Sequence, residues 1–117
     1  MNYRDTRIYQ CATELLNATH GIIEALPPGY AFLADQLRRA ASSIVLNFAE
    51  GCGKNSPADR RRYFHNARGS AYEVAAAVDV ALAFGAITAA ERDNVAELCE
   101  HTCAMLTRFA ACNPRRR

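Results

Sequence analysis

The sequence contains no long apolar run, no secretion signal and no pattern typical of β-strands. No stretch approaches the roughly 20 apolar residues that are needed to cross a bilayer. The first residues lack the basic and then apolar order of a signal peptide. Nowhere do apolar and polar residues alternate with the period of a half-buried strand. We therefore expect a protein of the cytoplasm, without membrane contact and without a β-sheet.

The cysteine count and the net charge also exclude some classes of protein. Five cysteines, an odd number, leave at least one thiol unpaired, and two of them fall within apolar helical stripes, so we interpret them as reduced. A formal charge of +2 is too small to require a polyanionic partner. Arginines nevertheless form local clusters at 38–39, 60–62 and 115–117. Such clusters can act locally where the net charge does not.

Length and composition indicate one globular domain that spans residues 1–117. Most domains hold roughly 100 to 150 residues, and a second core would leave each core too little apolar surface to bury. With 50% hydrophobic and 22% charged residues, the chain has enough apolar groups to offset the entropy cost of folding. It contains no internal repeat, low-complexity segment or linker.

Apolar residues recur every three or four positions in four segments, as they do in amphipathic helices. We predict helices at about 5–26, 32–50, 57–84 and 89–112, followed by a basic tail at 113–117. Pro27-Pro28-Gly29 ends the first helix, and Gly51-Cys52-Gly53 is expected to end the second through a glycine in the left-handed region. Connections this short force neighbouring helices to run antiparallel. The predicted fold class is therefore all-α, an antiparallel up-down four-helix bundle.

Two of the predicted helices begin with recognisable caps. Ser56 is a good N-cap before Pro57 and Asp59. Thr88 and Glu91 form a capping box, in which each side chain can satisfy a free backbone amide. The residues expected to face the core are Tyr63, Ala67, Ala71, Val74, Val78 and Ala81 in the third helix, with Phe64 and Leu82 alongside, and Val95, Leu98, Thr102, Met105 and Phe109 in the fourth.

Polar side chains form a stripe beside the core line on each of the two middle helices. At about 100° per residue, the stripe residues are Arg39, Ser43, Asn47 and Glu50 on the second helix and Arg62, Asn66, Ser70 and Glu73 on the third. In an antiparallel hairpin the two stripes can meet through hydrogen bonds and ion pairs. We interpret them as fixing the helix register and the oligomer geometry. A ligand or nucleic-acid site is the alternative.

A second apolar face lies outside the core lines. Leu46 on the second helix and Val80 and Phe84 on the third would be exposed in a monomer, with Ala76 and Ala77 beside them. Several apolar residues on one face are what a subunit interface requires. We therefore predict a homo-oligomer whose interface buries Leu46, Val80 and Phe84.

The segment from Leu37 to Gly51, LRRAASSIVLNFAEG, resembles the signature helix of the bacterial four-helix-bundle proteins known as 23S ribosomal RNA intervening-sequence proteins. Arg62-Tyr63-Phe64 and the run from Ala67 to Glu73 look like the second motif of that family. The family is also similar to the accessory variability determinant proteins of diversity-generating retroelements, which form pentameric barrels and associate with a reverse transcriptase and nucleic acid. The resemblance implies a homopentamer that contacts RNA or a nucleoprotein.

The sequence offers little chemistry for catalysis or for a cofactor. The run from Gly51 to Lys54 has the wrong glycine spacing for a phosphate loop and follows a helix rather than a strand. His20 and His65 project outward from their helices, and the Glu-x-x-His pattern of di-iron bundles is absent. Cys99 and Cys103 lie on one helix face and could bind a metal, so a metal- or thiol-dependent protein is the alternative function. We predict no catalytic site, no cofactor and no metal.

The basic residues are the one positive indication of a ligand. Most of them are expected to cluster around one end of the bundle, and a ring of subunits would repeat each cluster and multiply a weak attraction for phosphate. The predicted contact residues are Arg38, Lys54, Arg60, Arg61 and Arg68. The predicted function is a non-enzymatic oligomeric scaffold that docks RNA or a nucleoprotein partner.

Overall fold

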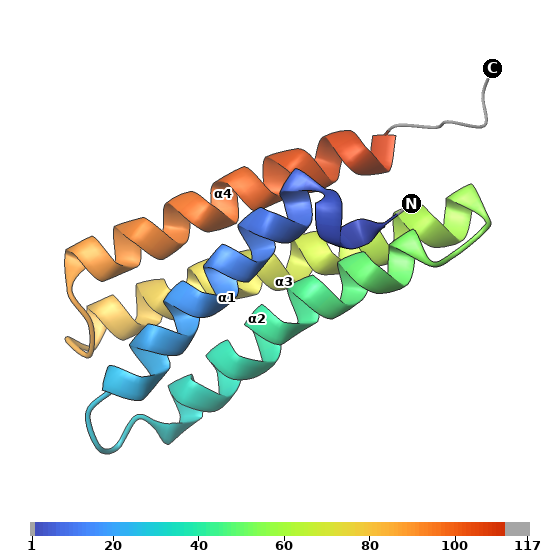
Figure 1. Cartoon of the computed structure of the whole chain (residues 1–117). Coiled ribbons are helices and arrows are strands. Elements are labelled where there is room, and N and C mark those ends of the chain that lie inside the picture. The colour runs from blue at the N-terminus through green and yellow to red at the C-terminus, as the bar shows by residue number, and fades with distance from the viewer. Residues whose placement is uncertain (1, 112–117) are drawn as a thin grey trace.

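The computed structural model describes residues 2–111 and contains four long helices (Figure 1). They are α1 (Arg7–Ala25), α2 (Ala31–Cys52), α3 (Pro57–Ala83) and α4 (Ala89–Ala111), preceded by a short 3₁₀ helix, η1 (Tyr3–Asp5). Over these residues there is no strand, and no helix has the length and apolarity needed to cross a membrane. The predicted all-α fold class is confirmed. The predicted basic tail at 113–117, and position 112 of the last predicted helix, lie outside the described residues.

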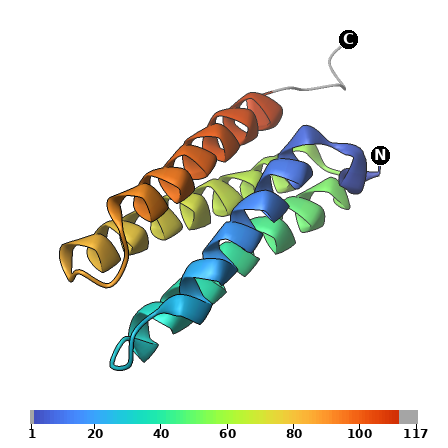
Figure 2. The ribbon, with the colours of Figure 1, turned by 60° about the vertical axis from the view of Figure 1, so that its left-hand side comes forward.

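The helices form a ring in which each one packs against its two neighbours. α2 contacts α3, α3 contacts α4, and α1 lies against both α2 and α4 (Figure 2). Neighbours run antiparallel, so this is the predicted up-down bundle. α1 and α3 begin, and α2 and α4 end, at what we name the terminal end. The connections between α1 and α2 and between α3 and α4 lie at the opposite, distal end (Figure 1).

α1 begins two residues later than predicted, because Thr6 is its N-cap. The Thr6 Oγ1 atom accepts a hydrogen bond from the backbone N–H of Tyr9 at 3.1 Å, and Thr6 itself has extended backbone angles. The residues before it form η1 instead. At its other end α1 stops one residue earlier than predicted, because Leu26 precedes a proline and is therefore extended.

The prediction that a left-handed glycine ends α2 is wrong. α2 runs two residues beyond its predicted end, and Gly53, which follows it, has φ −85°. Gly51 is instead buried inside the helix, where an added Cβ atom would lie 2.6 Å from Cε1 of Phe64. The absent side chain therefore allows α2 and α3 to approach closely. The glycines with positive φ are in the distal connections, at Gly29 (97°) and Gly85 (78°).

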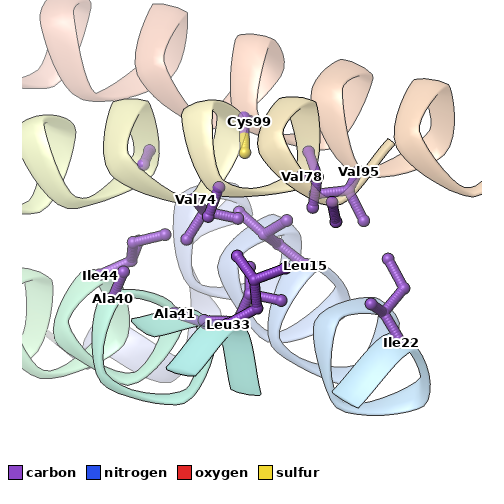
Figure 3. Packing of buried hydrophobic residues seen from close by; sticks show 14 of the residues in the cluster. Leu15, Ile22, Leu33, Ala40, Ala41, Ile44, Val74, Val78, Val95 and Cys99 are labelled. Carbon is purple, nitrogen blue, oxygen red and sulfur yellow. The ribbon is translucent and has the colours of Figure 1, made fainter. Parts of the chain in front are cut away.

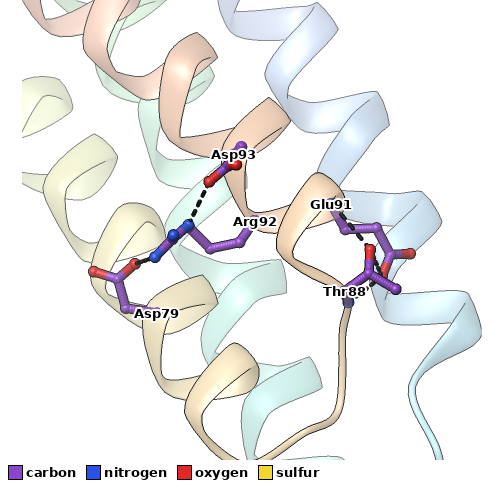
Figure 4. Close-up of polar contacts among 5 residues, drawn as sticks. All are labelled: Asp79, Thr88, Glu91, Arg92 and Asp93. Carbon is purple, nitrogen blue, oxygen red and sulfur yellow. Dashed lines mark hydrogen bonds and ion pairs between the residues drawn. The ribbon is translucent and has the colours of Figure 1, made fainter.

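The predicted caps of α3 and α4 are confirmed. Ser56 Oγ accepts a hydrogen bond from the Asp59 backbone N–H at 3.3 Å, and Pro57 is the first helical residue. Thr88 Oγ1 accepts from the Glu91 backbone N–H at 3.1 Å, and the Glu91 carboxylate accepts from the Thr88 N–H at 2.8 Å (Figure 4). Each cap satisfies an amide that has no partner within its helix, which is worth about 1 kcal/mol.

The core consists of two clusters, one toward each end. The distal cluster contains mainly aliphatic side chains and alanines from all four helices, including Leu15 and Val95, both 0% exposed (Figure 3). The terminal cluster is aromatic, because the ring centroid of Phe48 lies 5.6 Å from those of Phe64 and Phe109. The bundle is therefore held by two chemically different regions along its length.

The buried faces of α3 and α4 differ from the predicted core lines. On α3, Tyr63 is only half-buried, whereas Phe64, expected beside the core line, is buried, and Ala77, predicted on the second apolar face, is 6% exposed and belongs to the core. The buried residues of α4 are Val95, Cys99, Thr102, Cys103, Leu106 and Ala110, whereas Leu98, Met105 and Phe109 are only half-buried. α4 is thus turned so that its small cysteines fit where it packs closely against the alanine-rich α3.

Candidate functional site

The polar stripes of α2 and α3 meet near the middle of the bundle. Ser43 Oγ and Ser70 Oγ lie 2.7 Å apart, and Asn47 Nδ2 donates to Ser43 Oγ at 2.8 Å. All three side chains are half-buried. This small network satisfies its own polar groups and holds the two helices in one register.

The remaining members of the stripes lie at the surface, where ion pairs contribute little to stability. Their contacts are Glu50 with Lys54 (3.2 Å), Arg62 with Asp59 (3.3 Å), Arg39 with Gln36 (3.3 Å) and Glu73 with Gln36, and Asn66 is exposed. Of these contacts only the hydrogen bond from Gln36 to Glu73 joins α2 to α3. Among the stripe residues, the contacts that join α2 to α3 are therefore the serine pair and this hydrogen bond.

The predicted basic contact residues do not form one cluster. Arg60 and Lys54 lie together at the terminal end, where Arg60 Nη1 donates to the Lys54 carbonyl oxygen at 3.4 Å. Arg61, next to Arg60 in sequence, is exposed. Arg38 lies in the distal half of α2 and pairs with Asp35 at 3.4 Å. The group of basic residues at the terminal end is therefore smaller than predicted, and Lys54 within it is already paired with a carboxylate.

Arg68 also lies apart from the basic residues at the terminal end, in a groove of about 470 Å³ between α3 and α4. Its Nη2 donates to the Tyr72 hydroxyl at 3.3 Å, and its guanidinium lies over the Tyr72 ring. Its Nε atom is buried and has no hydrogen-bond partner in the described part of the chain. Arg68 is thus held by the α3 surface and does not join Arg60 and Arg61.

Cys99 and Cys103 form part of the core and have little capacity for chemistry. They are 3% and 7% exposed, and burial raises the pKa of Cys99 from its ordinary value of 9.0 to about 12. Burial also raises the pKa of Cys103, whose Sγ donates to the Arg68 carbonyl oxygen at 3.8 Å. A protonated thiol is a poor nucleophile and metal ligand. Within residues 2–111, no set of three or more His, Cys, Asp or Glu side chains is placed to hold a metal ion.

Exposed apolar side chains lie where the second apolar face was predicted. Leu46, Val80 and Phe84 are 67%, 40% and 57% exposed, outside both core clusters. Phe32, at the start of α2, is 55% exposed, and its ring centroid lies 6.3 Å from that of Phe84. We name Phe32, Leu46, Val80 and Phe84 the α2–α3 face.

A basic cleft that the sequence did not reveal lies between α1 and α4 at the terminal end. It contains two cavities of about 470 and 480 Å³, and Arg7 and Arg108 line both of them. The first, which we name the terminal cavity, is otherwise lined by Thr6, Ile8, Met105 and Phe109. The second, the inner cavity, also contains Gln10, Cys11, Glu14, His101 and Ala104. Because Arg7 and Arg108 come from the first and last helices, only the bundle topology brings them together.

Residues 4–108 match the sequence model of a family described as 23S rRNA-intervening sequence protein. The chain belongs to this family. The match confirms the family membership that the resemblance of residues 37–51 predicted. A crystal structure of a protein of unknown function from the S23 ribosomal protein family of Bacteroides thetaiotaomicron has a TM-score of 0.83 and 16% identity, covering 90% of this chain and 99% of that one. At this identity the likeness shows the fold alone, and comparison with curated proteins gives no significant match.

In this member of the 23S rRNA-intervening sequence family, charge separates along the bundle. Taking each helix from its midpoint toward the distal end, the acidic residues are Glu24, Asp35, Glu73, Asp79, Glu91, Asp93 and Glu97, and the basic ones Arg38, Arg39 and Arg92, while Glu100 lies at the midpoint of α4. Toward the terminal end the basic residues are Arg4, Arg7, Lys54, Arg60, Arg61, Arg62, Arg68 and Arg108, and the acidic ones Asp5, Glu14, Glu50 and Asp59. The terminal end is therefore positive and the distal end negative, which the sequence order hides because the chain reverses direction at each connection.

Ion pairs occur at both ends of this family member, and at the terminal end they involve Lys54 and Arg62. At the distal end Arg92 is held between Asp79, at 3.1 Å, and Asp93, at 2.8 Å (Figure 4). At the terminal end, Arg7 and Arg108 take part in no ion pair with any residue from 2 to 111. No carboxylate among residues 2–111 therefore neutralises the charge of these two arginines.

Proposed function

We propose that this chain is a non-enzymatic subunit of a homo-oligomeric helical scaffold that docks RNA or a nucleoprotein partner on its basic surface. The predicted relation to accessory variability determinant proteins, and the homopentamer that it implies, are part of this proposal. The observation that carries it is the α2–α3 face. Large apolar side chains exposed on the outside of a bundle are unfavourable in water and typical of a subunit contact.

Burial of the α2–α3 face against a neighbouring copy supplies a driving force for assembly. Burying a Leu, Val or Phe side chain completely is worth roughly 1.5–3 kcal/mol. Since the four side chains are 40% to 67% exposed, about half of that gain is still available at each of them. The total, about 4 kcal/mol, lies at the low end of the roughly 4–15 kcal/mol that association costs. A closed ring, in which every subunit contacts two neighbours, is therefore favoured over an isolated pair.

The RNA part of the proposal is supported by the family and by the charge distribution. The family carries the description 23S rRNA-intervening sequence protein. The terminal end also presents arginines without acidic partners among the described residues. Arginines that neutralise phosphates release counterions, which favours binding. The metal- or thiol-dependent alternative is less well supported, because Cys99 and Cys103 are buried in the core and burial raises the pKa of both thiols.

Charged substitutions on the α2–α3 face test the assembly. In the double variant Leu46→Glu, Phe84→Glu, unpaired carboxylates would have to be buried in every interface, at a cost of several kcal/mol per subunit. We expect light scattering to report monomers with the helical circular dichroism of the parent. The matched control is Tyr72→Glu, because Tyr72 is 57% exposed, like Phe84, but lies beside the α3–α4 groove.

The control variant is expected to keep the mass of the parent. A Leu46→Glu, Phe84→Glu protein that kept both the parent's mass and its helix content would contradict the proposed interface. A parent protein that is itself monomeric would contradict the oligomer as a whole. Loss of helix in the double variant would place these two residues in the core instead.

A further inference from the structure

We infer that the cleft between α1 and α4 at the terminal end, with Arg7 and Arg108, is the site that binds the phosphates of an RNA strand. The inference rests on the proposed function and adds a location to it. Neither arginine belongs to the Arg60 and Arg61 run that the sequence singles out. The two side chains line the same two cavities, although they come from opposite ends of the chain.

The first reason is that these arginines have donors to spare. A guanidinium group has five N–H donors in a flat fork, which suits two phosphate oxygens at once. Where a carboxylate occupies that fork, as Asp59 does at Arg62, part of it is already used. Over residues 2–111, neither Arg7 nor Arg108 donates to any carboxylate within ion-pair distance.

The second reason is the composition of the terminal cavity. Besides the two arginines it is lined by one hydroxyl residue, Thr6, and by apolar side chains, and it contains no acidic residue. Glu14 is the one carboxylate of the inner cavity, where His101 is also present. An anion in the terminal cavity therefore meets two positive charges and no negative charge in its lining.

The third reason is the apolar part of that lining. Met105 and Phe109 are half-buried, so each keeps some surface in the cleft. A free inorganic anion gains nothing from such a surface, whereas a nucleobase or ribose can pack on it while the adjacent phosphate contacts the arginines. Cation and apolar surface side by side thus favour a nucleotide chain as the occupant.

Repetition of the cleft favours RNA over an acidic protein. In the proposed homo-oligomer the same cleft would recur once in each subunit. A single strand repeats its phosphates at regular intervals and can occupy several clefts in succession, which multiplies a weak contact. An acidic protein could do so only if its own carboxylates had a matching repeat.

Three double variants, each removing two positive charges, test the location. The first, Arg7→Gln with Arg108→Gln, changes the cleft. The second, Arg60→Gln with Arg61→Gln, changes the arginine run noted in the sequence. The third, Arg38→Gln with Arg39→Gln, is the control in the distal half of α2. Binding of a fluorescein-labelled single-stranded RNA of about 20 nucleotides is measured by anisotropy over a range of salt concentrations. Circular dichroism shows whether each variant is folded.

The cleft variant is expected to bind about tenfold more weakly, and its salt slope should fall by roughly 1.4, since each contact to single-stranded nucleic acid contributes about 0.7. The control should lose less than about threefold, and the Arg60 variant should lie between the two. Equal affinities for the cleft variant and the control would overturn the inference while leaving RNA docking in place. Tighter binding of polyglutamate than of RNA would overturn the choice of RNA as occupant.

A parent protein that bound no RNA would remove the RNA part of the proposed function, and a separate measurement then decides on the cleft. Inorganic phosphate is titrated into the parent while the arginine Nε–Hε signals are followed by NMR. Shifts at Arg7 and Arg108 that exceed those at Arg38 would support an anion site there. Absence of any shift at the two cleft arginines would overturn it.

Discussion

At the distal end of the bundle Arg92 is held between two aspartates, whereas at the terminal end Arg7 and Arg108 have no carboxylate partner among residues 2–111. The distal end also closes its α3–α4 connection with a capping box of Thr88 and Glu91. Polar groups there are satisfied within the chain. At the terminal end Lys54 and Arg62 are paired with carboxylates, but Arg7 and Arg108 are not paired within residues 2–111. Under the proposed function, this difference makes the terminal end the expected docking surface.

The cores of the two ends differ as well. The distal cluster is built from aliphatic side chains, alanines and two cysteines, and the terminal cluster from three phenylalanine rings with a few smaller side chains. Large rigid rings leave little tolerance for an added atom, and Gly51 is needed where α2 passes Phe64. The end that carries the basic surface is therefore also the one with the more exacting packing.

Removal of a ring from the terminal cluster should have the largest effect on stability. Phe48→Ala deletes a fully buried side chain between two other rings and is expected to lower the free energy of unfolding by about 3–5 kcal/mol. The matched control is Tyr72→Ala, since Tyr72 is 57% exposed and lies outside the α2–α3 face; it should cost less than about 1 kcal/mol. Urea unfolding of both variants gives the comparison, and similar losses in the two would contradict the assignment of Phe48 to the core.

The next largest effect compares one helical glycine from each end. Gly51→Ala places a Cβ atom 2.6 Å from a Phe64 ring carbon, which should cost about 1–3 kcal/mol through overpacking. Gly21→Ala, toward the distal end of α1, meets no atom within 4 Å and should gain about 0.5–1 kcal/mol from helix propensity. Thermal and urea unfolding should move in opposite directions for the two variants. A neutral or stabilising Gly51→Ala would show that α2 and α3 do not need this close approach.

Helix caps and the main periodicity were readable from the sequence because they depend on residues a few positions apart. Ser56 acts on Asp59, and Thr88 on Glu91, whatever the rest of the chain does. Gly51 was different. Its role depends on Phe64, a residue of the next helix, so the sequence alone suggested a helix stop where the structure has a close contact between helices.

The candidate site was less predictable than the fold. The Arg60 and Arg61 run is visible as adjacent letters, but Arg7 and Arg108 are brought together only by the bundle topology. Their signal in the sequence was the position of each at the terminal end of its predicted helix. The buried line on α4 was misplaced for a related reason, because its rotation depends on how closely the alanines of α3 allow it to pack.

The cysteines of the two regions should differ in how strongly they make the free energy of unfolding depend on pH, and this effect is smaller than those of the substitutions above. Above pH 9 the unfolded chain loses the Cys99 proton, while the folded chain keeps it up to a pKa of about 12, so stability should fall as pH rises through this range. Between pH 8 and 10 the loss due to this thiol is expected to be about 1 kcal/mol. Cys99→Ala should remove that part of the pH dependence, as measured by urea unfolding at each pH.

Cys52 provides the control at the terminal end. Burial raises its pKa too, but the residue is only half-buried. Cys52→Ala should therefore leave most of the pH dependence in place, and Cys52 should react with iodoacetamide well before Cys99 in the folded protein. Equal reaction rates for the two thiols would contradict the burial of Cys99 in the distal cluster.

The most direct test of the basic terminal end as the RNA-binding surface is photo-crosslinking. RNA containing 4-thiouridine is irradiated with the protein, and the crosslinked peptides are identified by mass spectrometry. Crosslinks are expected in residues 3–11 and 104–111, which line or adjoin the α1–α4 cleft, and they should weaken in the Arg7→Gln, Arg108→Gln variant. Crosslinks concentrated around residues 88–97 at the acidic distal end, unchanged in that variant, would contradict the account.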